Sequence, residues 1–209
     1  MQSGTAAPLL QATQIVKDYP SVKVLKNVDI SVASGDTLAV IGPNGAGKTT
    51  LFKVLSGEVF ADSGVVLYQG RDVTRMPGWK RVRSGFGRSF QVARIFADLT
   101  TAQNVLVAVE ASIRGKARSI ASLVACRPLP QARDMVDEAL EEVGLARKAA
   151  IEARFLSHGD KKRLELAMSL VLRPDILLLD EPTAGMSPAD RKASVDLLAA
   201  VKQRHGMTV

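Results

Sequence analysis

A glycine-rich loop constrains the fold of this chain more than any other feature of its sequence. Residues Gly42–Thr49 have the sequence G-P-N-G-A-G-K-T and fit the pattern G-x-x-x-x-G-K-[ST]. The loop follows the apolar run Thr37–Ile41, which predicts a strand buried on both faces of a parallel sheet. It precedes a predicted helix from Lys48 to Ser56, which Gly57 can end in a left-handed conformation. This order of elements predicts a phosphate-binding loop in an α/β domain.

The residue types of the loop explain how it would hold a polyphosphate. Glycines allow positive φ and let backbone N–H groups approach the ligand without Cβ clashes. The helix that begins near Lys48 adds its free N–H groups and the positive end of its dipole. Lys48 supplies a charge for the β- and γ-phosphates, and the Thr49 hydroxyl suits Mg²⁺, which takes oxygen ligands. A glycine-rich turn could match by chance, but the flanking strand and helix argue against that.

A second apolar run ends in two acids. Ile176–Leu179 is followed by Asp180 and Glu181. An acid at the carboxyl end of a central strand faces the crevice where open sheets bind ligands. Asp180 can therefore belong to the Mg²⁺ shell, and Glu181 can polarise an attacking water. Taken alone, such a run is only a strand leaving the core; paired with the loop, it predicts nucleotide hydrolysis. The chain has no Asn-Lys-x-Asp element for guanine, which favours ATP.

Composition narrows the class of protein. Of the 209 residues, 46% are hydrophobic and 23% charged, as in ordinary globular domains. The net charge of +7 allows nucleic acid or anionic lipid as a partner, but only 4% of residues are aromatic, too few for a stacking platform. We therefore expect no nucleic acid partner, and interpret basic clusters such as Lys80-Arg81 and Lys161–Arg163 as solvated faces. No apolar segment has the length of a membrane span, so no direct membrane insertion is expected. The single cysteine, Cys126, fits a reducing cytoplasm.

The rest of the chain predicts an antiparallel patch beside a mostly parallel sheet. Strands are expected at residues 15–16, 22–32 and 65–68. From residue 101 to 154 helical spacing takes over, with an apolar stripe formed by Met135, Val136, Ala139, Leu140 and Val143. We expect one domain over residues 1–209, with a core at 1–91 and 157–209 and a helical subdomain at 92–156. Further helices are expected at 157–172 and from Ser187-Pro188 to Gly206, and 207–209 as the start of a strand.

Four fragments together resemble the ATPase subunits of ABC transporters. They are Asn44 in the loop, Leu156–Asp160 before a helix, Asp180–Thr183 and Gly185–Pro188. The resemblance covers nearly the whole chain, and Leu156–Asp160 is its most specific fragment. It implies the P-loop fold of ABC ATPases, with ATP and Mg²⁺ as cofactors and ATP hydrolysis as the activity.

The resemblance also implies a set of site residues. Catalysis is assigned to Glu181, Lys48 and Gln91, and the metal to Thr49, Gln91 and Asp180. Nucleotide binding is assigned to Tyr19, Gly42, Asn44, Gly45, Ala46, Gly47, Lys48, Thr49, Thr50, Ser157 and Gly159. Tyr19 would stack on adenine, although a tyrosine before a proline is also an ordinary turn residue. Gln91 would sense Mg²⁺ and the attacking water.

Residues 156–160 carry two interpretations. In the family, Ser157 and the Gly159 N–H would bind ATP held by the other subunit. The spacing of Ser157 and Asp160 is also a capping box, and both interpretations can hold together. The chain departs from the common Leu-Ser-Gly-Gly-Gln form at His158 and Asp160. An acid near a phosphate is unfavourable unless it points to its own helix N-terminus.

The stretch from Gly85 to Gln91 and the residues Ile95-Phe96 resemble the ATPases of branched-chain amino acid importers and their urea or amide relatives. This implies a motor subunit that pairs with a second ATPase subunit, identical or not, and with transmembrane permease subunits. Its place would be cytoplasmic, peripheral on the inner face of the cell membrane. Alternatives are a soluble ABC ATPase acting on nucleic acid or in cofactor assembly, and a phosphate-loop kinase, which leaves 156–160 unexplained.

The resemblance gives one expectation for the end of the chain. The family carries one more core strand after the last helix, and then a switch histidine. The sequence is therefore expected to stop short of that histidine, and His205, at a helix end, is expected to be a surface residue.

Overall fold

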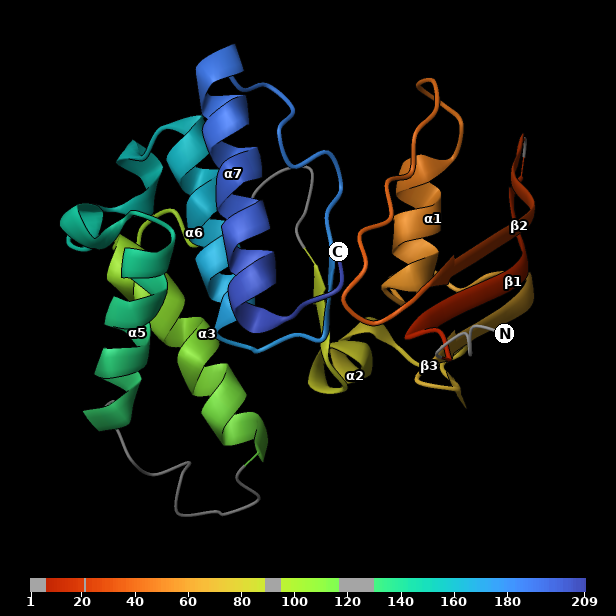
Figure 1. Cartoon of the computed structure of the whole chain (residues 1–209), viewed down its shortest axis with the longest axis horizontal. Coiled ribbons are helices and arrows are strands. Elements are labelled where there is room, and N and C mark those ends of the chain that lie inside the picture. The colour runs from red at the N-terminus through yellow and green to blue at the C-terminus, as the bar shows by residue number, and fades with distance from the viewer. Residues whose placement is uncertain (1–6, 21, 89–94, 117–129) are drawn as a thin grey trace, which may run out of the picture. The chain divides into compact units, whose positions relative to one another are not determined.

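The computed structural model describes residues 7–20, 22–88, 95–116 and 130–209, and the chain divides into two units. Unit 1 comprises residues 1–86, 175–180 and 206–209, and unit 2 comprises residues 87–174 and 181–205. Most of the strands and the glycine loop lie in unit 1, and most of the helices, which Figure 1 labels, lie in unit 2.

Unit 1 contains the expected antiparallel patch. Its sheet has the order β2-β1-β3-β4, formed by β1 (Leu10–Tyr19), β2 (Val22–Val32), β3 (Ser63–Tyr68) and β4 (Arg71–Asp72). Strand β1 begins five positions before the predicted strand and pairs with both β2 and β3. Its residues Leu10, Ala12 and Ile15 are buried and begin the apolar core of the unit.

Helix α1 (Lys48–Leu55) follows the glycine loop, as predicted. Leu51, Val54 and Leu55 are buried against the sheet and form part of the core of unit 1. Gly57 follows the helix with φ +73°, the left-handed conformation expected for a residue that ends it.

The predicted strand Thr37–Ile41 is wrong. This segment has no strand conformation, Leu38 is 42% exposed and Ile41 is 90% exposed. The Leu38 N–H donates to the Val209 carbonyl at 2.8 Å, and the Val209 N–H donates to the Asp36 carbonyl at 3.0 Å. Among the described residues, no strand lies beside Val40 and Ile41, so pairing stops where it has just begun. A strand requires a hydrogen-bonded partner along its length, and among the described residues this segment has one only at its start.

Strand β6 (Ile176–Leu178) is buried, and its sheet partner is β5 (Phe86–Arg88). On its other side Ile176 forms a parallel bridge with Thr208. The Leu177 N–H donates to the Thr208 carbonyl at 2.8 Å, and the Thr208 N–H donates to the Asp175 carbonyl at 3.0 Å. Residues 207–209 therefore run parallel to β6, as the prediction of a strand start at this place implied.

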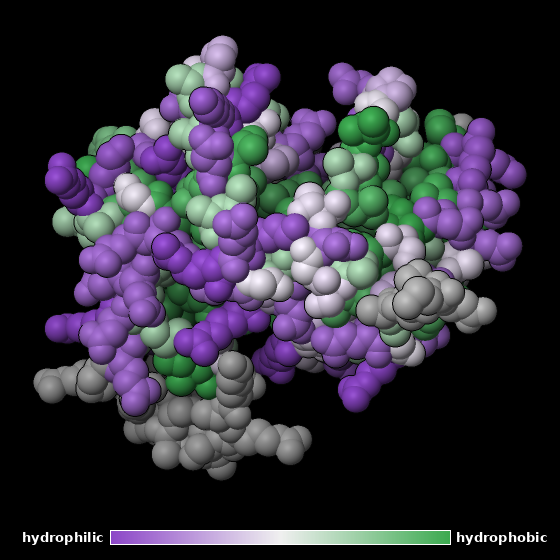
Figure 2. Space-filling view, in the orientation of Figure 1, coloured by the Kyte–Doolittle hydropathy of each residue, from purple (hydrophilic) through white to green (hydrophobic). Residues whose placement is uncertain are grey.

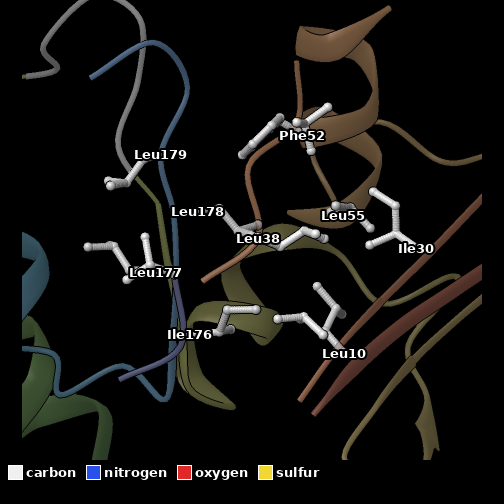
Figure 3. Close-up of a pocket in the computed structure, with 12 residues that line it drawn as sticks. Leu10, Ile30, Leu38, Phe52, Leu55, Ile176, Leu177, Leu178 and Leu179 are labelled. Atoms are coloured by element: carbon white, nitrogen blue, oxygen red, sulfur yellow. The ribbon is translucent and has the colours of Figure 1, made fainter. Parts of the chain in front are cut away.

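An apolar cavity of about 70 Å³ is lined by residues of both α1, which follows the glycine loop, and β6, which precedes Asp180. It lies within unit 1 and is lined by α1, β6, the first two strands and the segment before the glycine loop (Figure 3). The lining residues are Leu10, Ile30, Val32, Leu38, Val40, Phe52, Leu55, Ile176, Leu177, Leu178, Leu179 and Val209. The helix after the loop and the strand before Asp180 thus belong to one apolar core.

Unit 2 is built around three helices that pack on one another: α3 (Thr101–Lys116), α5 (Pro130–Glu142) and α6 (His158–Leu170). Of the predicted stripe on α5 and its end, Val136, Ala139, Leu140 and Val143 are buried and Met135 is half-buried. Hydrophilic side chains cover the surface over α5 in Figure 2, which fits an amphipathic helix.

Two short 3₁₀ helices, η1 (Ala146–Lys148) and η2 (Ala153–Phe155), join α5 to α6. The last helix, α7 (Pro188–His205), begins after Ser187, whose hydroxyl accepts the Asp190 N–H at 3.2 Å. Gly206 ends it with φ +61°, so both predicted boundaries are confirmed.

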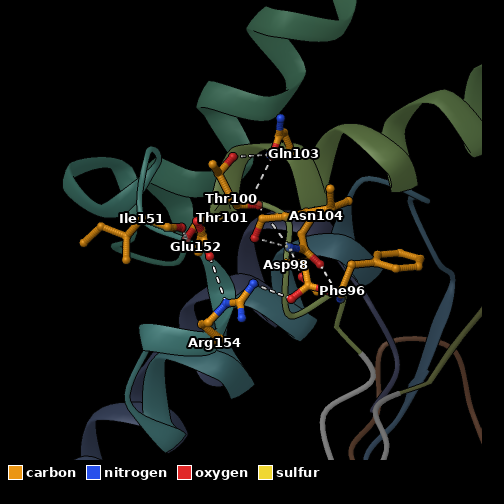
Figure 4. Close-up of polar contacts among 10 residues, drawn as sticks. Phe96, Asp98, Thr100, Thr101, Gln103, Asn104, Ile151, Glu152 and Arg154 are labelled. Carbon is orange, nitrogen blue, oxygen red and sulfur yellow. Dashed lines mark hydrogen bonds and ion pairs between the residues drawn. The ribbon is translucent and has the colours of Figure 1, made fainter.

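Asn104 fixes the loop that precedes α3. Its buried side chain accepts the Phe96 N–H at 2.8 Å and donates to the carbonyls of Phe96 and Thr100, each at 3.0 Å (Figure 4). At the start of α3 the Thr100 N–H donates to the Gln103 side-chain oxygen at 2.8 Å, and the Gln103 N–H donates to the Thr100 hydroxyl oxygen at 3.1 Å, which is a reciprocal cap. The loop is therefore held by side chains of the helix that follows it.

Candidate functional site

The glycine loop has the backbone conformation that its residue types predicted. Gly45 has φ +81° and Gly47 has φ +91°, in the region that L-residues rarely adopt. A Cβ at Gly47 would lie 3.0 Å from the Val24 carbonyl oxygen and 3.0 Å from Leu25 Cδ2. Gly47 is also the N-cap of α1, so its conformation sets where the free N–H groups of the helix point.

Lys48 lies across the loop. Its Nζ donates to the Gly42 carbonyl at 2.7 Å and to the Pro43 carbonyl at 2.9 Å. Residues 42–46 are exposed, and Thr49 and Thr50 are half-buried in the first turn of α1. The loop therefore brings one cation and two hydroxyl-bearing residues together at the N-terminus of a helix, where anions bind.

Arg81 anchors the opposite end of the same helix. It lies in α2 (Gly78–Arg83), is fully buried, and donates to the carbonyls of Val54 and Leu55 at 2.9 and 2.6 Å. It also donates to the Met76, Val73 and Thr74 carbonyls. Burial lowers the pKa of Arg81 to about 10, against an opposing effect of Asp72.

The burial of Arg81 corrects the interpretation of its basic cluster as a solvated face. The same correction applies to Lys162, which is buried and pairs with Glu165 at 3.5 Å. A cation near the C-terminal end of a helix also interacts favourably with the helix dipole. Arg81 thus stabilises α1 from its C-terminal end, and the sequence pattern gave no indication of this.

The two predicted acids have different surroundings. Asp180 is buried, 4% exposed, and follows β6 after one residue. Glu181 is exposed and has φ +49°, a strained backbone conformation for a residue that carries a side chain. The Ala184 N–H donates to the Glu181 carbonyl at 3.0 Å, so the chain turns directly after the acids.

Ser157 caps α6 as the sequence predicted. Its hydroxyl oxygen accepts the Asp160 N–H at 3.1 Å, and the hydroxyl donates to Asp160 Oδ2 at 2.8 Å. Lys148 Nζ donates to the same carboxylate oxygen at 2.5 Å. A Cβ at Gly159 would meet no atom within 4 Å, so space over its backbone is open. Asp160 therefore points to its own helix N-terminus.

Burial, hydrogen bonds and nearby charges act on the pKa of Asp160. Burial alone would raise the pKa of this carboxyl, but the hydrogen bonds from Lys148 and Ser157, with the nearby charge of Arg163, outweigh burial and hold the pKa below its usual value. The carboxylate is therefore charged at neutral pH.

His158, the other departure from the common pattern, contacts the loop after the acids. Its Nε2 lies 3.2 Å from the Ala184 carbonyl oxygen. A Cβ at Gly185, which has φ +73°, would lie 3.6 Å from the same Nε2. Within unit 2, His158 thus links the start of α6 to the turn that follows Glu181.

The remaining predicted residues lie at separate places. Tyr19 ends β1, is 43% exposed, and has Lys17 Nζ 5.6 Å from its ring centroid. His205 is exposed and has Nε2 2.9 Å from Glu142 Oε1, as expected for a surface residue. Gln91 and Cys126 lie outside the described residues.

Thr49 and Asp180 were predicted as magnesium ligands, and both carry oxygen atoms of the kind that Mg²⁺ takes. Among the described residues, no group of three or more His, Cys, Asp or Glu side chains could hold a metal ion. One hydroxyl and one buried carboxylate still fit Mg²⁺, which keeps several waters and takes its other ligands from phosphates. A magnesium site of this kind does not require a complete set of protein ligands.

Comparison with known proteins assigns the family. The model of the family described as ABC transporter matches residues 25–184, three quarters of the chain. This chain belongs to the ABC transporter family. The match includes the glycine loop, residues 156–160 and the two acids, so this ABC domain binds a nucleotide and is an ATPase.

Relatives of this ABC ATPase include named transport proteins. It is 33% identical over 206 residues to the high-affinity branched-chain amino acid transport ATP-binding protein LivG of Escherichia coli (strain K12), with 97% of this chain and 80% of that protein covered. It is 32% identical to BraF of Pseudomonas aeruginosa, a protein of the same description, with the same coverage.

Solved structures of ABC domains have the same fold. One is cbiO1 from Clostridium perfringens, with a TM-score of 0.80 and 27% identity over 97% of this chain and 77% of that one. Another is an ATP-binding cassette of an ABC transporter in its ADP conformation, with a TM-score of 0.80 and 31% identity over 97% and 80%. Of the described helices of this ABC ATPase, none combines the length and apolar character that a membrane crossing requires.

Proposed function

We propose that this chain is the ATP-hydrolysing motor of an importer for branched-chain amino acids or related small solutes. The observation that carries the proposal is the open, Ser157-capped N-terminus of α6, in a chain that is similar to LivG and BraF over 97% of its length. Two such subunits, identical or not, would close on ATP and act on transmembrane permease subunits. The chain would then lie at the cytoplasmic face of the membrane.

Each part of the site has a defined task in this proposal. Lys48 leaves the loop carbonyls for the β- and γ-phosphates, and the N-terminus of α1 contributes its N–H groups. Thr49, Asp180 and Gln91 would hold Mg²⁺, which supplies positive charge for the transferred phosphoryl group. Glu181 would accept a proton from the attacking water.

Other residues would bind the nucleotide from two sides. Tyr19 would stack on adenine, and the loop residues Gly42, Asn44, Gly45, Ala46 and Gly47, with Thr50, would surround the phosphates of the same subunit. Ser157 and the Gly159 N–H would meet the γ-phosphate held by the partner subunit. We keep the predicted division into a core (1–91, 157–209) and a helical subdomain (92–156) as part of this proposal.

The experiment is reconstitution of the chain with candidate permeases and a solute-binding protein in vesicles. We expect ATP hydrolysis to rise several-fold when the binding protein carries leucine, isoleucine or valine, and to stay at the basal rate with an unloaded binding protein. If only urea or a short amide stimulates hydrolysis, the transported solute belongs to the urea and amide class instead of the branched-chain amino acids. Hydrolysis that responds to DNA or RNA but to none of these solutes would contradict the importer.

A further inference from the structure

A basic side chain from outside α6 reaches the one acid at the start of that helix. Lys148 ends η1, and its Nζ lies 2.5 Å from Asp160 Oδ2. The side chain of Asp160 is 11% exposed and that of Lys148 is 43% exposed, so the carboxylate is buried while its partner reaches solvent. The Lys148 N–H donates to the Leu145 carbonyl at 2.8 Å, which fixes the backbone from which the lysine extends.

The same carboxylate oxygen also accepts the one hydrogen bond that the Ser157 hydroxyl can donate. Ser157 Oγ donates to Asp160 Oδ2 at 2.8 Å and accepts the Asp160 N–H at 3.1 Å. A hydroxyl has one hydrogen to donate, so Ser157 cannot donate to a phosphate while it donates to Asp160. Asp160 therefore competes with a phosphate for the hydrogen bond that the Ser157 hydroxyl donates.

Lys148 weakens this competition in two ways. It shares Oδ2 with Ser157, which reduces the negative charge available to hold the serine proton. It also places a positive charge beside a carboxylate that would otherwise repel a polyphosphate at the same helix N-terminus. Arg163, one turn further along α6, adds to the positive charge near Asp160.

We propose that Lys148 is a positioning residue that compensates Asp160 and so allows Ser157 to bind the γ-phosphate of a partner subunit. The proposal rests on the proposed role of Ser157 in ATP binding. It explains how an acid can occupy a helix start that must meet a phosphate, because the acid and Lys148 enter the site as a pair. Neither residue needs to touch the nucleotide.

A double-mutant cycle tests the pair. We expect Lys148→Met to lower kcat/KM for ATP at least about tenfold, because it leaves the Asp160 charge uncompensated beside the phosphate. Asp160→Asn should stay within about threefold of wild type, and the double variant should recover to the level of Asp160→Asn. The control is Arg147→Met, which removes the same charge from the exposed neighbouring position of η1 and should leave kcat/KM unchanged.

The possible outcomes separate the two proposals. A double variant as slow as Lys148→Met, or a Lys148→Met enzyme as fast as wild type, overturns the role of Lys148. Melting temperatures are measured on the same samples. If Lys148→Met and Asp160→Asn both lose stability and activity together, the ion pair only stabilises the fold, and the positioning role of Lys148 is overturned. Ser157→Ala in the same assay tests the role of Ser157 itself: full turnover there, with Lys48→Ala inactive, contradicts the proposed contact of Ser157 with ATP.

Discussion

The guanidinium of Arg81 donates a hydrogen bond of 2.6 Å to the carbonyl of Leu55, the last residue of the helix that begins with Lys48. One end of this eight-residue helix carries Lys48 of the glycine loop, and the carbonyls at its other end accept hydrogen bonds from a buried arginine. The described hydrogen bonds of Arg81 go to backbone carbonyls of α1 and of the segment between β4 and α2. Arg81 therefore holds the C-terminal end of the helix that follows the glycine loop.

Replacement of Arg81 by methionine should destabilise unit 1. The substitution keeps a long apolar stem but removes the donor to five carbonyls, of which those of Val54, Leu55 and Val73 are buried. A buried carbonyl left unsatisfied costs about 1–3 kcal/mol before relaxation. We expect the free energy of unfolding to fall by about 2–4 kcal/mol in urea denaturation. Arg83→Met, at an exposed position of the same helix, is the control and should change it by less than about 0.5 kcal/mol. Equal effects of both variants would show that the hydrogen bonds of Arg81 do not contribute to the free energy of unfolding.

The sequence predicted the elements whose signals are local. The caps and ends of α1, α6 and α7 follow from residues such as Ser157, Ser187 and Gly206, because a helix boundary depends on a few neighbouring groups. The glycine loop and the acids after β6 were likewise found from local patterns. The conformation of Gly45 and Gly47 agrees with what the motif required.

The wrong predictions concern properties that depend on distant parts of the chain. Thr37–Ile41 has the composition of a buried strand, but a strand forms only where a neighbour pairs with it, and among the described residues pairing reaches only the start of this segment. Arg81 was assigned to a solvated cluster because spacing alone does not show which of several adjacent bases turns inward. The Lys148–Asp160 pair was missed for the same reason, since twelve positions separate its members.

The pKa of Asp160 predicts how stability depends on pH. Its folded-state pKa is below the ordinary value of 3.8, so the charged form stabilises the fold above that value, and this stabilisation is lost as the pH falls through the lower folded pKa. Thermal unfolding should show wild type melting above Asp160→Asn by a constant margin from pH 7 to about pH 5, and the margin should shrink below about pH 3.8. A margin that stays constant into the acid range would show that the Asp160 charge does not stabilise the fold.

Tyr19 should contribute to affinity for the base of the nucleotide. Stacking of a base on an aromatic ring is worth about 1–3 kcal/mol, so Tyr19→Ala should raise the Kd for ATP by about fivefold or more. Tyr19→Phe keeps the ring and should bind as wild type does. Titration of a fluorescent ATP analogue measures both variants. Equal affinities of the alanine and phenylalanine variants would remove Tyr19 from the adenine site and leave it as a residue at the end of β1.

Gly47 should be intolerant of any side chain. It has φ +91°, and a Cβ there would lie 3.0 Å from the Val24 carbonyl oxygen. Gly47→Ala should therefore displace the start of α1 and weaken ATP binding at least about tenfold, because the helix N–H groups would no longer converge on the phosphates. Gly70→Ala, at φ +73° with open space around its Cβ, is a control for backbone strain far from the loop and should keep ATP affinity. Loss of affinity in both variants would point to general destabilisation.

The central claim is that ATP binding depends on Lys48 and ATP hydrolysis depends on Glu181. The most direct measurement is parallel ATP titration and steady-state phosphate release for wild type, Lys48→Ala and Glu181→Gln. Lys48→Ala should lose binding, because a charge-assisted contact to phosphate is worth about 1.5–3 kcal/mol. Glu181→Gln should bind ATP as wild type does and release phosphate at least about 10²-fold more slowly, because an amide cannot accept the proton of the attacking water. Phosphate release by Glu181→Gln near the wild-type rate, or unchanged ATP affinity in Lys48→Ala, would contradict the account.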